Sequence, residues 1–536
     1  MRIVAALIAG ASLIAAASPP LSPAELQNLV SVSTGGPGCA VAIVQDGEIV
    51  FEQGFGLADL DTKAPITPAT SFNTASMTKQ FTGMAVALLI ADGKLKESDD
   101  IRTFLPKLRN YGTAITIANL LNHSSGLRNH MALAAFKPGD HLPSHQEALA
   151  LVFRQSALNF TPGTRHQYQS PNYVLLAEIV ARVSGMAYPD FLERQVLKPL
   201  GITNSGFITA GLARAYGGSA EKGWTIQDKV NRAMGSSGLQ SSVRDFARWM
   251  INYDRLTVGG ADARAKMLST SRLADGSAIP YRYGLIKQAD YAGVKGLTRI
   301  AHGGQTAAYR SAFSYFPGRG FGNVVMCNHM ANANGVDQAI VSAYVGKLKP
   351  PQPATVGGSG TAPAMPAELP GQLAGTWYSA ADDDIREFTV KDGGLALRYF
   401  GEDYPLQFLG GSRFAIPGQG EFRFSRDGME EAFDGQARLR FARLTPTAAQ
   451  PMADFAGTYR STDVDGPVTI TVKGDKLGLT YPAGEATLRQ IGRDHFASPE
   501  EDFSSVRFER SSDGRVSGLS LTVSSGITRL RFARVG

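Results

Sequence analysis

Ser76 and Lys79 form an S-x-x-K sequence, a spacing that suits covalent catalysis. Apolar residues recur at helical spacing from Met77 onward, and Gly93 provides a natural end, so the pair lies at or near a helix start. Residues three apart share a helix face, which places Lys79 beside Ser76. A neutral amine can take the serine proton, and the N–H groups of a helix start stabilise negative charge. The spacing predicts Ser76 as nucleophile and Lys79 as its base.

Tyr168 lies in a polar stretch, residues 162–170, directly before an apolar helix predicted over residues 173–183. A tyrosine in such a turn is usually a packing residue. Beside a cationic lysine, however, the pKa of its phenol would fall, and the phenol could then act as a base. Tyr168 is therefore the second candidate catalytic residue.

His302, Gly303 and Gly304 follow a strand-like segment, residues 298–301. Paired glycines beside a strand allow another backbone or an acyl substrate to approach closely. The backbone N–H of Gln305, just beyond them, could complete an oxyanion hole with the N–H of Ser76. We expect His302 to be neutral near pH 7 and to orient Tyr168 or the substrate.

The elements that must position these residues follow a clear order. Residues 39–45 and 48–51 are strand-like and joined by Asp46-Gly47, a two-residue hairpin signal. Helical patterns dominate from residue 76 to about 253, and strands return over residues 281–328. This order predicts an α+β domain over residues 25–346, with helices packed on a mainly antiparallel sheet.

A linker and two repeated units follow this domain. Residues 347–370 are rich in proline and glycine, which indicates a linker. Beyond it, the segment starting at Leu373 matches the one starting at Phe455, and both units close with Arg-Leu-Arg-Phe-Ala-Arg. The repeat predicts two small antiparallel β-barrels, at residues 371–446 and 452–536, because closure removes exposed strand edges.

The N-terminus and the composition limit the cellular setting. Residues 1–17 combine a positive start, a short apolar run and small residues, which predicts a signal peptide and an exported, periplasmic protein. The net charge of +6 is modest for 536 residues and no basic stripe occurs, so nucleic-acid binding is unsupported. His141 and His145 have zinc-like spacing but no third ligand, so we expect no metal and no cofactor.

S-x-x-K alone is a weak signal, since residues 219–222 match it too, but the order of the three motifs is specific. S-x-x-K, then Y-x-S, then H-G-G resembles the active-site motifs of serine penicillin-binding proteins and class C β-lactamases. The segments at residues 115–127, 235–242 and 309–313 also resemble that superfamily. The resemblance covers residues 25–346 and implies the β-lactamase-like fold, an acyl-enzyme on Ser76, and hydrolysis of that acyl-enzyme by water.

The architecture of a hydrolase domain followed by two lipocalin-like barrels resembles the bacterial D-aminopeptidases of peptidase family S12. Those enzymes carry histidine, as at His302, where β-lactamases have lysine. Two features depart from the family pattern: Ser170 stands where asparagine helps hold the substrate amide, and residues 481–488 look short for the barrel loop that covers the site. In the fold that the sequence resembles, Cys39 and Cys327 come to the same end of neighbouring strands, where they could form a disulfide.

The resemblance implies a small-molecule or short-peptide acyl substrate held by Gly303, Gly304, Gln305 and Ser170. A D-aminopeptidase-like peptidase or amidase is the leading hypothesis. An esterase or a β-lactamase/DD-carboxypeptidase-like hydrolase, and a non-catalytic envelope-binding protein, stay open as alternatives, as do cell-wall association and the oligomeric state. Since all three motifs precede residue 347, we expect the barrels to be dispensable for building the nucleophile and residues 18–346 to fold alone.

Overall fold

The computed structural model describes most of the chain. The described residues are 19–30, 33–139, 142–207, 211–227, 232–348, 364–399, 401–416, 420–433, 438–445, 447–448 and 450–535. The predicted signal peptide, residues 1–17, lies outside them, as do His141 and most of the predicted linker. Within the described part, no helix has the length and apolar character needed to cross a bilayer.

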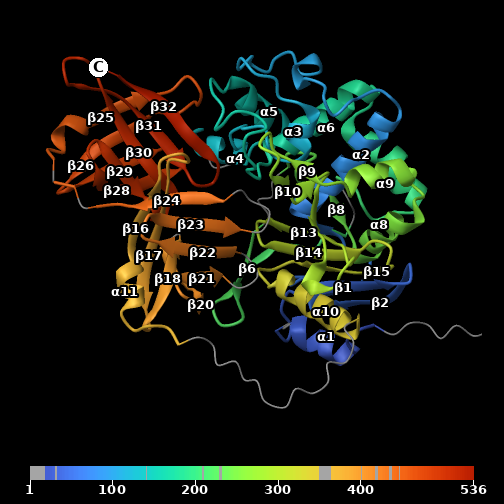
Figure 1. The fold of residues 1–536 in the computed structure, drawn as a ribbon. Coiled ribbons are helices and arrows are strands. Elements are labelled where there is room, and N and C mark those ends of the chain that lie inside the picture. The colour runs from blue at the N-terminus through green and yellow to red at the C-terminus, as the bar shows by residue number, and fades with distance from the viewer. Residues whose placement is uncertain are drawn as a thin grey trace, which may run out of the picture.

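The first domain is built on a seven-stranded antiparallel sheet with the order β11-β12-β13-β14-β15-β1-β2 (Figure 1). Its strands are β1 (Cys39–Gln45), β2 (Glu48–Phe55), β11 (Tyr281–Arg282), β12 (Leu285–Gln288), β13 (Arg299–Thr306), β14 (Tyr309–Phe316) and β15 (Phe321–Cys327). Asp46 and Gly47 both have positive φ, as the predicted two-residue hairpin between β1 and β2 requires. The predicted α+β architecture with a mainly antiparallel sheet is confirmed.

Both faces of the sheet are covered, which explains why β1 is apolar throughout. Cys39, Val41 and Ile43 pack towards α1 (Pro23–Val30) and α10 (Ala333–Leu348). The alternate residues Ala40, Ala42 and Val44 belong to the larger core on the opposite face. Side chains of a strand alternate between its faces, so a strand between two layers has no polar side.

The larger core is formed with the helical part of the domain, which carries the S-x-x-K sequence. Its helices are α2 (Lys79–Ala91), α3 (Ile117–Leu121), α4 (His130–Ala134), α5 (His145–Arg154), α6 (Pro171–Ser184), α7 (Tyr188–Leu192), α8 (Val243–Arg255) and α9 (Gly260–Met267). Short helical turns are η1 (Ala75–Thr78), η2 (Ile101–Thr103), η3 (Glu193–Leu197), η4 (Lys198–Leu200) and η5 (Tyr291–Gly293). Short strands are β3 (Leu57–Asp59), β4 (Ala64–Pro65), β5 (Phe72–Asn73), β6 (Tyr216–Ser219), β7 (Gly223–Ile226), β8 (Gln240–Ser241), β9 (Ser271–Arg272) and β10 (Ala278–Ile279).

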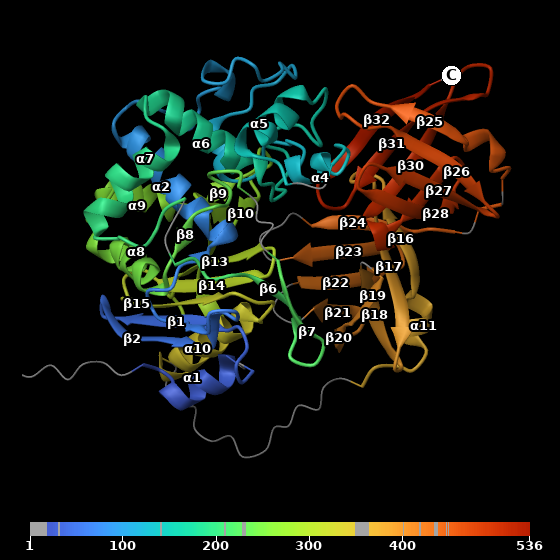
Figure 2. The ribbon, with the colours of Figure 1, turned by 180° about the vertical axis from the view of Figure 1, so that it is seen from behind.

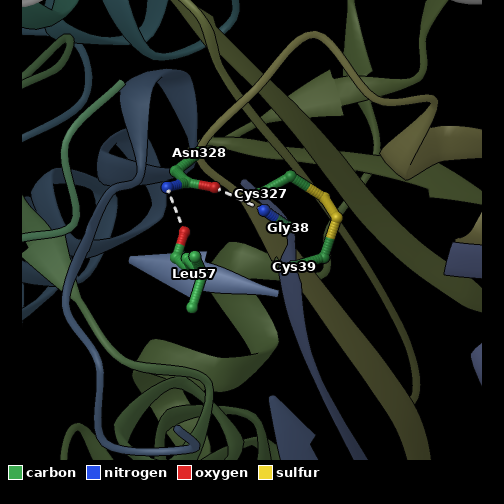
Figure 3. The surroundings of a disulfide bond; sticks show 5 residues. All are labelled: Gly38, Cys39, Leu57, Cys327 and Asn328. Carbon is green, nitrogen blue, oxygen red and sulfur yellow. Dashed lines mark hydrogen bonds between the residues drawn. A yellow bond between two sulfur atoms is a disulfide. The ribbon is translucent and has the colours of Figure 1, made fainter. Parts of the chain in front are cut away.

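A disulfide joins Cys39 and Cys327, which face each other on the antiparallel strands β1 and β15 (Figure 3). Both cysteines are buried. The neighbouring Asn328 accepts a hydrogen bond from Gly38 N at 2.8 Å and donates to Leu57 O at 3.0 Å. The start of β1, the end of β15 and β3 are therefore held together by one covalent bond and one amide side chain.

The C-terminal part consists of two antiparallel sheets that curl into barrels, as predicted. The first is a nine-stranded, nearly closed sheet that follows α11 (Leu369–Leu373). Its strands are β16 (Gly375–Ser379), β17 (Asp384–Lys391), β18 (Gly394–Tyr399), β19 (Glu402–Pro405), β20 (Gln407–Gly410), β21 (Arg413–Ile416), β22 (Gly420–Ser425), β23 (Gly428–Phe433) and β24 (Leu439–Arg443).

The second is a closed eight-stranded barrel, introduced by η6 (Ala453–Phe455). Its strands are β25 (Gly457–Arg460), β26 (Val468–Lys473), β27 (Lys476–Tyr481), β28 (Gly484–Gly492), β29 (His495–Ser498), β30 (Phe503–Arg510), β31 (Val516–Val523) and β32 (Ile527–Val535), with η7 (Pro499–Glu501) after β29. We refer to the two sheets as the first and the second barrel.

The repeated sequence has a repeated structural role. Gly375 and Gly457 occupy equivalent places at the starts of β16 and β25, and both have positive φ. The last arginine of each repeat, Arg443 or Arg534, packs against that glycine and donates to the backbone carbonyls just before it. The repeat therefore preserves the contact that ties the last strand of each barrel to its first.

The second barrel shares a hydrophobic core with the first domain, and both views place it beside α4 (Figures 1 and 2). Leu133, Phe136 and Leu151 of the first domain pack with the apolar interior of the barrel. Arg128 donates to Asp463 at 2.9 Å, and the two side chains are only 2% and 5% exposed. Truncation would expose these apolar groups, and that residues 18–346 fold alone stays a prediction.

Candidate active site

Ser76 lies in η1, directly before the first turn of α2, which begins at Lys79. Lys79 Nζ donates to Ser76 Oγ at 3.0 Å and to the backbone carbonyl of Ser236 at 2.8 Å. Ala75, just before the serine, has a φ of 47°, a conformation that is strained for a residue with a side chain. The structure thus brings the predicted nucleophile and base into hydrogen-bond contact.

Lys79 is completely buried, and burial lowers its pKa to about 7. Aromatic rings surround the amine: Nζ lies 4.9 Å from the ring centre of Tyr168 and 5.9 Å from that of Tyr173. Near neutral pH a large share of the amine is therefore uncharged and able to accept the Ser76 proton. Once protonated, the ammonium is stabilised by the faces of the two rings.

Tyr168 lies next to this pair, but its ionisation differs from the expectation. Burial raises the pKa of its phenol well above 10, although the Ser76 and Tyr281 hydroxyls oppose that change. The expectation of a lowered pKa was wrong because a largely neutral lysine in a dry site does not stabilise a phenolate. The Oη atom is buried without a well-aligned hydrogen bond. Tyr168 is suited to pass a proton as a neutral phenol.

His302 is buried in β13, and burial lowers its pKa to about 3, so the ring is neutral as expected. Its Nδ1 lies 2.6 Å from Gly303 O, which assigns the proton to Nδ1. Its Nε2 therefore accepts from Tyr281 Oη at 3.0 Å. Both ring nitrogens of His302 are occupied, so its contact with Tyr168 is between the rings, with centroids 6.0 Å apart. That His302 orients Tyr168 or the substrate stays a prediction.

Tyr281 and His123 belong to the site although the motifs did not predict them. The Tyr281 ring lies edge-on to Tyr168, with centroids 5.6 Å apart, and connects it to His302. The His123 ring lies 4.4 Å from the Tyr168 ring, and its Nδ1 accepts from the Gln169 backbone N–H at 3.2 Å. His123 follows Asn122 in a segment that resembled the superfamily, which was the available signal. The sequence contained no corresponding signal for Tyr281.

Strand β13 approaches the nucleophile closely because Gly304 has no side chain. A Cβ atom there would lie 2.4 Å from Thr74 O and 2.4 Å from Ser311 Oγ. At Gly303 the nearest neighbour of such an atom would be Asn334, at 3.3 Å. Gly304 is therefore the glycine that the geometry demands, and it lets Gln305 reach the same pocket as Ser76. This arrangement suits an oxyanion hole formed by the N–H groups of Ser76 and Gln305.

A cavity of about 400 Å³ opens at Ser76. It is lined by Ser76, Met131, Leu142, Ser170, Ser236, Ser237, Gln305, Thr306 and Ala307. Ser170 lies at the start of α6 and faces this cavity, as its place in the second motif implied. The Ser237 hydroxyl is buried and has no hydrogen-bond partner, so it is available to a bound substrate. The described lining residues are all uncharged.

The short segment predicted near residues 481–488 makes a tight turn between β27 and β28. Tyr481 packs against Phe136, with ring centroids 5.7 Å apart, and no residue of that turn lines the described part of the cavity. Among the described residues no cluster of three metal-ligating side chains occurs. His145 contacts Glu178 at 3.8 Å, and His141 lies outside the described residues.

Comparison with known proteins shows the family of the chain. The profile of the beta-lactamase family matches residues 24–347, and a domain of unknown function, DUF3471, matches residues 442–534. D-aminopeptidase from Gluconobacter oxydans is 26% identical over 477 residues, covering 85% of this chain and 86% of that protein. D-aminopeptidase from Brucella canis is 27% identical over 464 residues, covering 84% of each.

Solved structures share the fold. The octameric penicillin-binding protein homologue from Pyrococcus abyssi has a TM-score of 0.52 and 24% identity, covering 76% of this chain and 96% of its own. The D-amino acid amidase from Ochrobactrum anthropi has a TM-score of 0.51 and 21% identity, covering 60% and 98%. The chain belongs to the beta-lactamase family: it is a serine hydrolase with the architecture of the D-aminopeptidases.

Proposed function

We propose that the protein is a D-aminopeptidase-like peptidase or amidase that cleaves short peptides or amides of D-residues through an acyl-enzyme on Ser76. The observation that carries this proposal is the contact of 3.0 Å between Lys79 Nζ and Ser76 Oγ, at a lysine whose pKa lies near 7. Such a lysine is a base at neutral pH and needs no second ionised group.

In the acylation step, Ser76 Oγ attacks the substrate carbonyl while its proton moves to Lys79 Nζ. The new C–O bond leaves a negative charge on the carbonyl oxygen, which the N–H groups of Ser76 and Gln305 hold. The C–N bond then breaks, and the leaving amine takes a proton that Lys79 returns through the neutral Tyr168 phenol.

In the deacylation step, a water molecule takes the place of the leaving amine. It attacks the ester carbonyl and gives its proton towards Lys79, and the same N–H groups hold the oxyanion. Ser76 recovers its proton when the acid product leaves. The two steps use the same residues in opposite directions, as reversible proton transfer requires.

The peptidase or amidase assignment draws on the D-aminopeptidase relatives, which align over most of both chains. An esterase is the second candidate, because no described side chain lining the cavity supplies a carboxylate for a free substrate amine. Export to the periplasm is part of the proposal. It is supported by the buried disulfide, since disulfides persist in oxidising compartments.

The decisive experiment compares the enzyme with its Ser76→Ala variant on the p-nitroanilides of D-alanine and L-alanine and on p-nitrophenyl acetate. We expect turnover of the D-anilide above the L-anilide, an acyl adduct by intact-mass measurement, and neither in the variant. Preference for the ester with no D-anilide turnover would favour the esterase. Equal turnover by Ser76→Ala, or no adduct on any substrate, would refute the serine mechanism and favour a binding protein.

A further inference from the structure

Helix α4 has two different neighbours on its two sides. Met131 lines the cavity at Ser76. Ala132 and Leu133, the next two residues, are buried in the hydrophobic cluster of the second barrel, together with Phe136 just beyond the helix. One turn of helix therefore forms both a wall of the active site and a part of the barrel core.

Phe136 closes the end of the second barrel that faces the hydrolase domain. Its ring lies 5.8 Å from that of Phe532 and 5.7 Å from that of Tyr481, measured between centroids. Its backbone carbonyl accepts from Gly466 N at 2.7 Å. A fully buried aromatic side chain fixes the segment that carries it, because its withdrawal would leave a cavity.

The turn between β31 and β32 holds the other end of α4. Asn129 caps the helix: its side chain accepts from Met131 N at 2.9 Å. The same asparagine donates from its backbone N–H to Gly526 O at 3.0 Å and from Nδ2 to Ser525 O at 2.8 Å. The residue that begins the helix of Met131 is thus bonded on both sides to the barrel.

Gly526 also reaches the segment of Tyr168. Its carbonyl accepts from Asn159 Nδ2 at 3.1 Å, and the same Nδ2 donates to Gln167 Oε1 at 3.0 Å. A Cβ atom on Gly526 would lie 2.1 Å from Gln169 Nε2, and its φ of 117° is unfavourable for other residues. A side chain at position 526 would therefore displace the Gln169 amide and strain the turn.

We propose that Met131 is a specificity-determining residue, and that the Ser525–Gly526 turn of the second barrel positions it. The barrel contributes no described residue to the cavity lining, so it acts on substrate size through α4. The methionine limits the bulk of the group beside the scissile bond, and the turn keeps the helix from moving outwards. This inference rests on the proposed acyl hydrolysis at Ser76 and names what selects its substrates.

The test compares kcat/KM for p-nitrophenyl acetate and p-nitrophenyl phenylacetate, which differ only in acyl bulk. Met131→Ala should raise the ratio of bulky to small substrate by about tenfold, the usual effect of a missing pocket wall. Gly526→Ala should move the ratio in the same direction. In the double variant the two effects should combine to less than their product, since both act on one wall.

Gly514→Ala is the matched control. Gly514 lies in the turn between β30 and β31, has a φ of 80°, and no atom lies within 4 Å of the place of a Cβ. This variant should leave the ratio unchanged. If Gly526→Ala fails to fold, Asn129→Ala takes its place, because it removes the cap and the bond to Ser525 without changing the barrel.

Ratios within twofold of the parent for both Met131→Ala and a folded turn variant would overturn the inference. If the change in the ratio for the double variant equals the product of the two single changes, the turn does not act through Met131. That result would overturn the proposal that the turn positions Met131. These outcomes are distinct from a failure of the proposed function, which would appear as Ser76→Ala retaining turnover of p-nitrophenyl acetate.

Discussion

Replacing the catalytic lysine should make the protein more stable while it abolishes turnover. Lys79 is fully buried, and its pKa falls from 10.5 to about 7. At 1.36 kcal/mol per pKa unit, holding this amine in the folded state costs about 4 kcal/mol at pH 7. Lys79→Met removes that cost and also removes the hydrogen bonds to Ser76 and Ser236, each of which contributes about 1 kcal/mol. We expect a net gain of about 2 kcal/mol.

The dependence of this stability gain on pH shows whether the buried amine of Lys79 causes it. Below about pH 7 the lysine is charged in both states and the full cost applies. Between pH 7 and 10.5 the unfolded chain binds a proton that the folded chain does not, so stability of the wild type rises with pH. The advantage of Lys79→Met over the wild type should therefore be largest at and below about pH 7, and should be about 3 kcal/mol smaller at pH 9.5 than at pH 7.

Thermal unfolding of both proteins at pH 7.0 and 9.5 measures this difference, with Lys107→Met as the control because Lys107 is exposed. The melting temperature of Lys79→Met should exceed that of the wild type by several degrees at pH 7.0, and should fall to that of the wild type or slightly below it at pH 9.5. A variant less stable than the wild type at pH 7.0, or a gap that does not depend on pH, would refute the assignment of Lys79 as a neutral base.

Three further predictions follow from the contacts described above. Tyr168→Phe should lower kcat/KM about 10²–10⁴-fold, and a change below threefold, with acylation rate-limiting, would mean that the phenol only packs. Asp463→Asn should destabilise the full-length protein by about 3 kcal/mol because Arg128 stays buried, and an unchanged melting temperature would contradict that. Replacing Cys39 and Cys327 together by alanine should cost about 2–5 kcal/mol of stability, and neither cysteine of the wild type should react with maleimide under denaturing, non-reducing conditions.

The sequence predicted the fold through features that depend on local pattern: hairpin glycines, helix periodicity and the repeat. It also predicted the contact of Ser76 with Lys79, because three residues of helix fix that geometry. The predicted ionisation of Tyr168 was wrong, since it depends on burial. The hydrogen bond of His302 to Tyr281 was missed, because Tyr281 lies 21 positions from His302 and in no motif. The core shared by Leu133 and the second barrel was also missed. An apolar residue on a short helix gives no indication of which domain it packs against.

Helix α4 packs against the second barrel, so the wall that it gives the active site depends on residues near the C-terminus of the chain. Arg128 donates to the carbonyl of Thr528, 400 residues later in the chain. Translation at about 5–20 residues per second separates the two by roughly 20–80 s. During that interval the nascent chain already contains Ser76, Lys79 and Tyr168. Asn129, however, lacks its hydrogen bonds to Ser525 and Gly526, and α4 lacks the barrel residues that pack against it. A chain that ends before the last two strands would carry the reactive serine without the barrel contacts that hold α4.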